Sequence, residues 1–383
     1  MLDGIELNHY DVKSFETNLI ERLPISQALL KSIRLLGEYR GKQQLFREQS
    51  PQVLATLRQA AIIQSTESSN RIEGVTAPLE RIKALVAEKT RPRDRSEQEI
   101  AGYRDALNTI HANFAHMPFT AGLVLQLHRD LFKHTTEPGG HWKSTQNEIT
   151  ELRSDGSRFV RFQPVAPHLT EDCMNRLHER FQAAWNSQEI EPLLLIPAYV
   201  LDFLCIHPFR DGNGRIARLL TLLLLYKAGY EVGRFISLEL IVEQNKAGYY
   251  DSLYRSSLKW HDGSHSLQPW TEYFLGVMLL AAYRDFEKRV GLVTGGKGAK
   301  TAGIIGAIRD FQRDFSVADL RKCCPHVSVD LIRKTLHELK SKKQVECLGR
   351  GAGAHWRKQP GFGKGQLGSS TANYVFDQTL LPI

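Results

Sequence analysis

Two long apolar segments dominate the hydrophobic pattern of the chain and predict buried helices. One covers residues 192–206, and the other follows a Gly-Asn-Gly turn and runs through residues 219–226. Apolar residues without polar alternation over this length favour a helix that is enclosed by protein on all sides. The residue before a proline disfavours helix, so the first helix should end at His207. We expect the second helix to span 213–227 and to end at Gly229.

Helical spacing of apolar residues extends through most of the first three-quarters of the chain. It predicts helices over most of 25–86, over 97–116, over 120–132, from 170 to 185, and in the region up to 287. The fold is therefore expected to be mainly α.

Two segments interrupt this helical pattern. Residues 89–95 are basic and polar and contain a proline, which is typical of a linker. Residues 147–162 carry two short strand-like runs around a turn at 154–157, and this pattern predicts a β-hairpin. The hairpin is the only clear β signal in the central region of the sequence.

The last quarter of the chain has the pattern of a separate small domain. Four glycines within residues 291–300 predict a hinge. Three helices and a hairpin with glycines near its tip are expected after it, at residues 302–311, 317–322, 328–342 and 345–358. This order is typical of a winged-helix domain, here residues 301–358. The Gly- and Ser-rich residues 359–383 are expected to form a flexible tail.

Composition indicates a soluble globular protein with more than one domain. The 383 residues are 42% hydrophobic and 24% charged, which suffices for two or three domains with their own cores. No apolar run reaches the length of a membrane span, and the N-terminal residues lack the features of a secretory signal. The five cysteines show no metal-ligand spacing, so we expect a reducing, cytoplasmic location and no membrane partner.

The net charge of +8 is concentrated near the C-terminus, where residues 301–358 hold twelve Lys and Arg but six Asp and Glu. A basic module predicts an anionic partner such as DNA, although a solvated basic surface explains the same composition. A winged helix that docks to protein or dimerises is an equal alternative to one that binds DNA.

Residues 207–218 combine side chains that suit phosphoryl or nucleotidyl transfer. His207 has the titration range of a general base, while the alternative is a helix-end histidine bonded to a backbone carbonyl. Asp211 has the hard carboxylate that Mg²⁺ prefers, and the alternative is a cap of the following helix.

The turn after Asp211 lies at a predicted helix N-terminus, where unpaired backbone N–H groups attract anions. Gly212, Asn213 and Gly214 form this turn, and the two glycines lack the Cβ atoms that would keep a phosphate away. Arg215 and Arg218 lie three residues apart and face one side of the helix. Arginines at a helix N-terminus oppose its dipole, so two of them favour an anionic ligand over a solvated face.

The twelve residues from 207 to 218 resemble the Fic family signature, His-Xaa-Phe-Xaa-Asp/Glu-Gly-Asn-Gly-Arg-Xaa-Xaa-Arg, at every fixed position. Similarity to the family covers roughly the first three-quarters of the chain. The resemblance implies a Fic-type helical core with a short β-hairpin flap. It also implies a protein adenylyltransferase, which transfers AMP from ATP to a Ser, Thr or Tyr hydroxyl of a target protein.

Carried over by position, the resemblance makes His207 the base and Asp211 the Mg²⁺ ligand. It assigns ATP binding to the helix start, residues Gly212, Asn213, Gly214, Arg215, Ile216, Ala217 and Arg218. Within this segment, Arg215 is expected to meet the inner phosphates and Arg218 the γ-phosphate.

Two further segments are similar to parts of the Fic family. Residues 140–149 resemble its flap, with Lys143 where arginine is commoner. Tyr249 and Tyr250 resemble its aromatic pair near adenine and ribose, while core packing is the alternative for these two side chains.

Upstream, residues 69–74 are similar to the family's inhibitory motif, Ser/Thr-Xaa-Xaa-Xaa-Glu-Gly/Asn. Ser69 and Glu73 lie one helical turn apart, before Gly74. The resemblance implies that Glu73 pairs with Arg218 and occupies the place of the γ-phosphate. The alternative is a surface glutamate before a glycine that ends the helix.

The predicted domains are an N-terminal helical region at 1–95 with the inhibitory helix near 62–74, a Fic core at 96–290, the winged helix at 301–358 and the tail. The predicted function is Mg²⁺-dependent AMP transfer to a protein, the chain itself included, restrained by Glu73. Transfer of UMP or phosphocholine, and removal of AMP with Glu73 orienting water, remain alternatives. The rival class is a DNA-binding regulator with a nucleotide-sensing or de-AMPylating site. The sequence does not identify the target protein. It does not determine the oligomeric state either, and a homodimer is one of the states that it allows.

Overall fold

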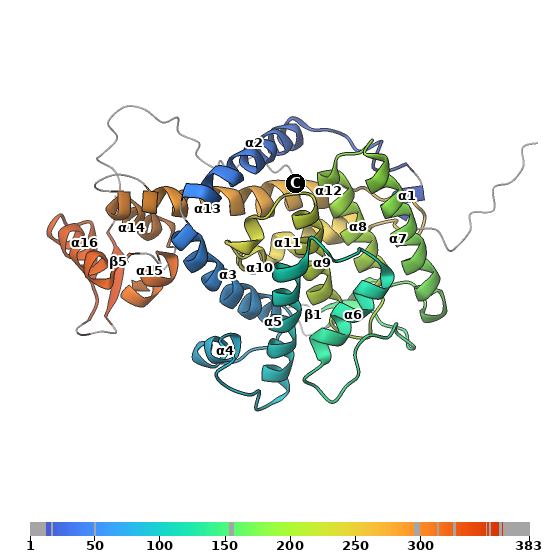
Figure 1. The fold of residues 1–383 in the computed structure, drawn as a ribbon, viewed down its shortest axis with the longest axis horizontal. Coiled ribbons are helices and arrows are strands. Elements are labelled where there is room, and N and C mark those ends of the chain that lie inside the picture. The colour runs from blue at the N-terminus through green and yellow to red at the C-terminus, as the bar shows by residue number, and fades with distance from the viewer. Residues whose placement is uncertain are drawn as a thin grey trace, which may run out of the picture. The chain divides into compact units, whose positions relative to one another are not determined.

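The computed structural model describes residues 13–16, 18–49, 51–152, 157–294, 299–311, 314–324, 327–349, 351, 354–359 and 362. The chain divides into two compact units, residues 1–290 and residues 291–383. Helices form most of both units, as predicted, and strands are few and short (Figure 1). Among the described residues, no helix is long and apolar enough to cross a membrane.

The first unit is a helical assembly with one β-hairpin (Figure 1). Its α-helices are α1 (Lys13–Glu16), α2 (Gln27–Gln49), α3 (Pro51–Ile72), α4 (Leu79–Val86), α5 (Arg95–Asn113), α6 (Ala121–Phe132), α7 (Thr170–Ser187), α8 (Pro192–Ile206), α9 (Asn213–Lys227), α10 (Leu238–Gln244), α11 (Lys246–Ser257), α12 (Gln268–Glu272) and α13 (Leu280–Thr294). Short turns of 3-10 helix are η1 (Pro167–Leu169) and η2 (Val232–Arg234), and η3 (Tyr273–Leu279) is a π-helical stretch.

Helices α8 and α9 form the centre of the first unit. Both have the bounds that the apolar pattern predicted, and nearly all their side chains are buried. They pack on each other, α7 packs on α8, and α5, α6 and α3 pack on α9. Because α9 is apolar on nearly every face, it is stable only with protein around it. The two helices therefore fix the loop between them, residues 207–212, at a rigid position.

The predicted hairpin is present as strands β1 (Ile149–Leu152) and β2 (Arg158–Phe162). They pair antiparallel, with Thr150 opposite Val160 and a register shift between Ile149 and Thr150. Residues 153–156, which include most of the predicted turn, lie outside the described part of the chain. Strand β2 also contacts α11, so the hairpin is attached to the core at one strand.

The two compact units divide at the start of the predicted hinge, 291–300, and helices extend into both of its ends. Helix α13 continues to Thr294, and helix α14 (Ala299–Asp310) begins at Ala299. Helical hydrogen bonding that propagates from α13 outweighs the single glycine at 291, because extending a formed helix adds one bond per residue. Residues 295–298, which hold the other glycines of the predicted hinge, are outside the described residues.

The second unit contains the predicted helices and hairpin. These elements are α14, β3 (Phe315–Ser316), α15 (Val317–Cys323), α16 (Val329–Ser341), β4 (Val345–Cys347) and β5 (His355–Lys358). The three strands form one antiparallel sheet in the order β3-β5-β4. Ile332, Leu336 and Leu339 of α16 pack in a core that also holds Trp356. Nearly all of the predicted tail, 360–361 and 363–383, lies outside the described residues.

Candidate active site

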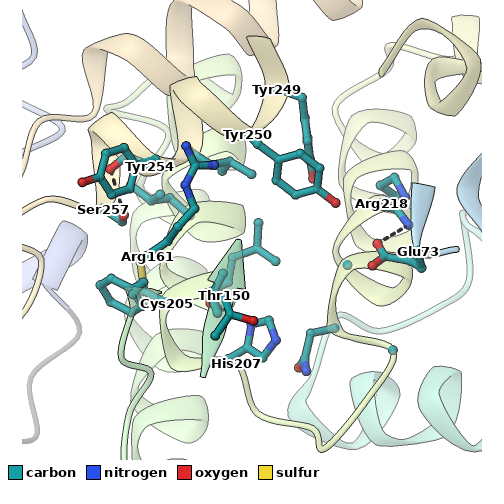
Figure 2. Close-up of a pocket in the computed structure, with 18 of the residues that line it drawn as sticks. Glu73, Thr150, Arg161, Cys205, His207, Arg218, Tyr249, Tyr250, Tyr254 and Ser257 are labelled. Carbon is teal, nitrogen blue, oxygen red and sulfur yellow. Dashed lines mark hydrogen bonds and ion pairs between the residues drawn. The ribbon is translucent and has the colours of Figure 1, made fainter. Parts of the chain in front are cut away.

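A cavity of about 940 Å³ lies at the C-terminal end of α8 and the N-terminal end of α9 (Figure 2). Strands β1 and β2 and helix α11 form its other walls, and Glu73 reaches it from the end of α3. This volume falls within the range of roughly 300–1,000 Å³ that is usual for ligand pockets. The cavity is lined by Glu73, Ile149, Thr150, Arg161, Phe162, Leu201, Leu204, Cys205, His207, Arg210, Asp211, Gly212, Asn213, Gly214, Arg218, Lys246, Ala247, Tyr249, Tyr250, Leu253, Tyr254 and Ser257.

His207 follows the last residue of α8 in a left-handed conformation, with φ 51° and ψ 61°. Its Nδ1–H donates to the carbonyl oxygen of Leu204 at 3.1 Å, which leaves Nε2 with a lone pair for the cavity. The pKa of His207 is lowered to about 4, mainly by burial and to a lesser degree by the nearby charge of Lys143. The ring is therefore neutral at pH 7. His207 thus both bonds a backbone carbonyl at the end of a helix and lines the cavity. The two interpretations from the sequence, a helix-end histidine and a general base, do not exclude each other.

The turn before α9 is present at Gly212, whereas Asn213 and Gly214 already belong to the helix. Gly212 has φ 82° and takes the N-cap position of α9 without a side-chain cap. Asn213 accepts the N–H of Phe209 at 2.9 Å and donates to the Phe209 carbonyl at 2.7 Å. Asn213 thus closes the loop on itself, and Gly212, Asn213 and Gly214 all line the cavity at the start of α9.

Asp211 lines the cavity but does not cap α9, so that alternative is wrong. Its Oδ1 accepts the N–H of Gly212, the adjacent residue, at 2.5 Å, whereas a cap would accept an N–H of the first helical turn. The Asp211 side chain is 55% exposed. Among the described residues, no group of three or more His, Cys, Asp or Glu is arranged to hold a metal ion.

Arg218 lies at the buried end of the cavity and is held by the end of α3. Its NH2 group contacts Glu73 Oε1 at 2.8 Å and the Ser69 carbonyl at 2.8 Å, and its Nε donates to Ser69 Oγ at 2.9 Å. The side chain is 6% exposed, and NH1 has no hydrogen-bond partner among the described residues. Gly74, with φ 83°, ends the turn that carries Glu73. The predicted ion pair between Glu73 and Arg218 is present (Figure 2).

Arg215, which the resemblance assigned to the inner phosphates, does not itself line the cavity, but its NH2 contacts the cavity-lining Asp211 at 3.5 Å. Its NH1 pairs with Glu99 of α5 at 2.5 Å and contacts Asn70 of α3 at 3.4 Å, and its side chain is 1% exposed. Ile216 and Ala217 are also buried in the core and do not line the cavity. These three residues fix α9 against its neighbours.

Tyr249 and Tyr250 both line the cavity, but they differ in burial. Tyr249 is buried and packs edge-on against Tyr250, Trp270 and Tyr273, as the core-packing alternative expects. Tyr250 is less buried, and Figure 2 shows its hydroxyl on the side of the Glu73–Arg218 pair.

Several residues that the sequence did not single out contribute to the cavity. Arg161 of β2 lies 4.7 Å from the centre of the Tyr254 ring, at the end of the cavity away from Arg218 (Figure 2). Lys246 donates to the carbonyl of Ile72, the last residue of α3, at 2.8 Å. Both contacts join distant segments, so no local pattern in the sequence indicates them.

Comparison with known proteins finds similarity to one family over the segment that holds most of this site. Residues 118–225 match the model of the Fic/DOC family. The chain is similar to proteins named "Protein adenylyltransferase Fic" from Nematostella vectensis, Culex quinquefasciatus and Drosophila grimshawi. The identities are 27% over 176 residues, 28% over 202 and 29% over 210, which cover 44%, 50% and 52% of this chain. The matches cover 39%, 36% and 39% of those relatives.

Two solved structures show the same fold. A Fic family protein from Desulfovibrio desulfuricans G20 superposes with a TM-score of 0.57 at 21% identity, over 90% of this chain and 98% of that chain. A Fic domain containing signaling protein from Bacteroides thetaiotaomicron VPI-5482 superposes with a TM-score of 0.56 at 20% identity, over 68% of this chain and 98% of that one. Residues 118–225 are therefore similar to the Fic/DOC domain, and the mostly helical fold is similar to that of solved Fic structures.

Proposed function

We propose that the protein transfers AMP from ATP to a Ser, Thr or Tyr hydroxyl of a protein, its own chain included, and releases pyrophosphate. One observation carries the proposal. A neutral imidazole at the end of α8 and the glycine-containing start of α9 face the same cavity. The adenylyltransferase names of the relatives agree with this reaction.

In the proposed step, the target hydroxyl oxygen attacks the α-phosphorus of ATP while the bond from that phosphorus to the pyrophosphate oxygen breaks. His207 Nε2 takes the hydroxyl proton, and the Leu204 carbonyl supports the imidazolium through Nδ1–H. The N–H groups at the start of α9 and the Arg218 guanidinium supply positive potential for the phosphates. Arg218 NH1, for which the described part of the chain supplies no hydrogen-bond partner, offers one such donor.

Asp211 is the residue that would hold Mg²⁺. It is the exposed carboxylate at the start of α9, and Mg²⁺ usually takes one or two carboxylates together with substrate phosphates, so a single carboxylate fits. The ion would neutralise charge on the phosphates when bound. Asp211 itself needs only to present a carboxylate oxygen to the cavity.

Glu73 is proposed to restrain this activity. Its carboxylate pairs with Arg218 and lies at the start of α9, in space that the outer phosphates of ATP would share. Negative charge there repels a triphosphate and misaligns it for in-line attack.

The test uses wild-type protein, Glu73→Gly and Glu73→Gly/His207→Ala, each incubated with cell lysate and ATP labelled at the α-phosphate. We expect strong protein labelling with Glu73→Gly, weak labelling with wild type and none with the double variant. Label at the γ-phosphate should not transfer, which separates AMP transfer from phosphorylation. Labelled UTP and GTP test other nucleotides, and mass spectrometry identifies the modified residue. Equal labelling by wild type and Glu73→Gly would refute the restraint, and no labelling by either would refute the transfer.

A second candidate function, DNA binding by a winged helix, is favoured by helix α16. Its apolar side is buried, while Arg333, Lys334 and Lys340 are exposed on the remaining surface. Such a helix suits the phosphates of a DNA groove. A gel shift with duplex DNA should weaken steeply with salt and disappear in Arg333→Ala/Lys334→Ala. DNA retention without AMP transfer would favour a regulator. AMP transfer without DNA retention would favour an enzyme alone. A cytoplasmic location and a homodimer remain predictions of the sequence.

A further inference from the structure

The loop that carries His207 is held by an unusual run of hydrogen bonds from the segment before β1. Four consecutive carbonyl oxygens, those of residues 206–209, each accept a donor. Lys143 Nζ donates to Ile206 O at 3.0 Å, and the Lys143 backbone N–H donates to Pro208 O at 2.8 Å. Asn147 Nδ2 donates to His207 O at 3.3 Å and to Phe209 O at 2.9 Å.

Lys143 and Asn147 also hold each other. Lys143 Nζ donates to Asn147 Oδ1 at 2.9 Å, so the ammonium orients the amide whose NH₂ group faces the loop. Lys143 is only 4% exposed although it is a lysine. Burying an ammonium is unfavourable unless it is well hydrogen-bonded, so its position indicates a specific requirement.

The loop needs such support because His207 is in the left-handed region, which costs a residue with a Cβ roughly 1–2 kcal/mol. The carbonyls of residues 207–209 also lie outside any helix or sheet, and buried carbonyls need donors. Asn213 Nδ2 supplies a second donor to Phe209 O, at 2.7 Å. Without donors at 206–209, the peptide planes that set the direction of the imidazole would be free to rotate.

The charge of Lys143 reaches the imidazole as well. Burial is the main cause that lowers the pKa of His207, and Lys143 lowers it further, while Glu73 and Asp211 raise it. Burial lowers the pKa of Lys143 itself to about 8, against a small opposing effect of Cys173. At pH 7, Lys143 is therefore charged and the imidazole is neutral.

We propose that Lys143 and Asn147 are positioning residues, which fix the backbone at 206–209 so that His207 Nε2 faces the reacting hydroxyl. The inference rests on the proposed AMP transfer. Neither residue lines the cavity, so both act through His207 and not through ATP.

The test is made in the Glu73→Gly protein with Lys143→Met, Lys143→Arg and Asn147→Ala, and with Lys83→Met as a surface control. We expect kcat to fall roughly 10- to 100-fold with Lys143→Met and Asn147→Ala, as for a misplaced catalytic group. KM for ATP should stay within about twofold, because binding contacts are intact. Lys143→Arg retains charge and donors and should recover most of the lost rate. Unchanged kcat, or a loss confined to KM, would overturn the proposal.

A second readout does not depend on activity. NMR titration of the His207 ring, assigned by comparison with His207→Ala, should show a raised pKa in Lys143→Met but not in Lys143→Arg. If Glu73→Gly transfers no AMP, the proposed function fails, while this titration still tests the positioning role. If Lys143→Met does not fold, the kcat of Asn147→Ala tests the positioning role in its place. A His207 titration that is the same in wild type, Lys143→Met and Lys143→Arg would contradict the close placement of Lys143 and His207.

Discussion

The Glu73 carboxylate lies directly against Gly214, so that a Cβ atom on Gly214 would fall 2.2 Å from Glu73 Oε1. The same oxygen is 2.8 Å from Arg218 NH2. Glu73 therefore places an anion at the N-terminus of α9, where the helix dipole stabilises negative charge. The carboxylate occupies the position that an anionic ligand of this helix would take.

The first prediction concerns Gly214→Ala. The added methyl would force the Glu73 carboxylate away from Arg218, so the variant should lose roughly 1–2 kcal/mol of unfolding free energy, as when a charged hydrogen bond is lost. In Glu73→Gly the methyl has no carboxylate to displace, and the loss should largely disappear. Chemical denaturation of the two single variants and the double variant measures this coupling. The same loss in both backgrounds would contradict the close contact.

The second prediction concerns Ser69→Ala. The change leaves the buried Nε–H of Arg218 without its partner, which costs roughly 1–3 kcal/mol. Arg218 should then hold Glu73 less firmly, so AMP transfer should rise above wild type but stay below Glu73→Gly. Ser68→Ala is the matched control, because the Ser68 hydroxyl makes no hydrogen bond with the described residues. Transfer by Ser69→Ala at or below the wild-type rate would argue against the restraint.

Much of this arrangement follows from local sequence. The bounds of α8 and α9 could be predicted because each apolar run is followed closely by a residue that stops a helix, His207 before a proline and Gly229. The Glu73–Arg218 contact came from a resemblance and not from periodicity. Helical spacing only placed Ser69 and Glu73 one turn apart, and in the structure Glu73 follows the end of α3.

The partner of Arg215 could not be predicted in this way. Spacing correctly placed Arg215 and Arg218 on one side of α9, and both face α3. Which ligand each arginine meets depends on α5, because Glu99 lies 116 positions away in the chain and takes Arg215. The contacts of Lys143 and Asn147 have the same origin, since their partners are carbonyls of a distant loop. Tertiary packing, which a single sequence does not reveal, decides these roles.

The third prediction separates structure from catalysis at Arg215. Arg215→Met removes one of the two arginines that pair with the buried Glu99 carboxylate, Arg95 being the other, and should cost roughly 1.5–3 kcal/mol of unfolding free energy. Arg215→Met/Glu99→Met should recover much of this loss. In the Glu73→Gly background, KM for ATP of the folded double variant should stay near that of the parent. A large rise of KM in a stable double variant would show that Arg215 contacts ATP.

The fourth prediction concerns metal dependence. Transfer by Glu73→Gly should stop when EDTA removes divalent cations and should return with Mg²⁺. Asp211→Asn weakens the proposed ligand, so it should need several-fold more Mg²⁺ for half-maximal rate. Asp251→Asn, which changes an exposed carboxylate of α11 outside the cavity, is the control and should not alter the Mg²⁺ requirement. An Asp211→Asn protein with the parent's Mg²⁺ dependence would exclude this carboxylate as the ligand.

The last prediction concerns acid stability. Burial lowers the pKa of His111 to about 3 and of His128, His207 and His265 to about 4. Between these values and about 6.5 the unfolded chain binds protons that the folded chain does not, so stability falls as the pH drops from 7 to 5. Each histidine contributes a loss of about 2 kcal/mol over this range. Asp202 has the opposite effect on stability, because burial raises its pKa to about 6. As the pH falls, the folded chain therefore binds this proton at a higher pH than the unfolded chain does.

His111 offers the cleanest test of this acid effect, because it lies away from the cavity and its Nε2 has no hydrogen-bond partner among the described residues. His111→Phe removes one titrating group and keeps an aromatic ring beside Tyr226. Urea denaturation at a series of pH values gives the slope of unfolding free energy against pH. The slope between pH 5 and 6 should decrease by about 1.2 kcal/mol per pH unit, slightly less than the value for one full proton, because the unfolded histidine is not fully protonated at pH 6. An unchanged slope would mean that His111 titrates normally and is not held neutral by burial.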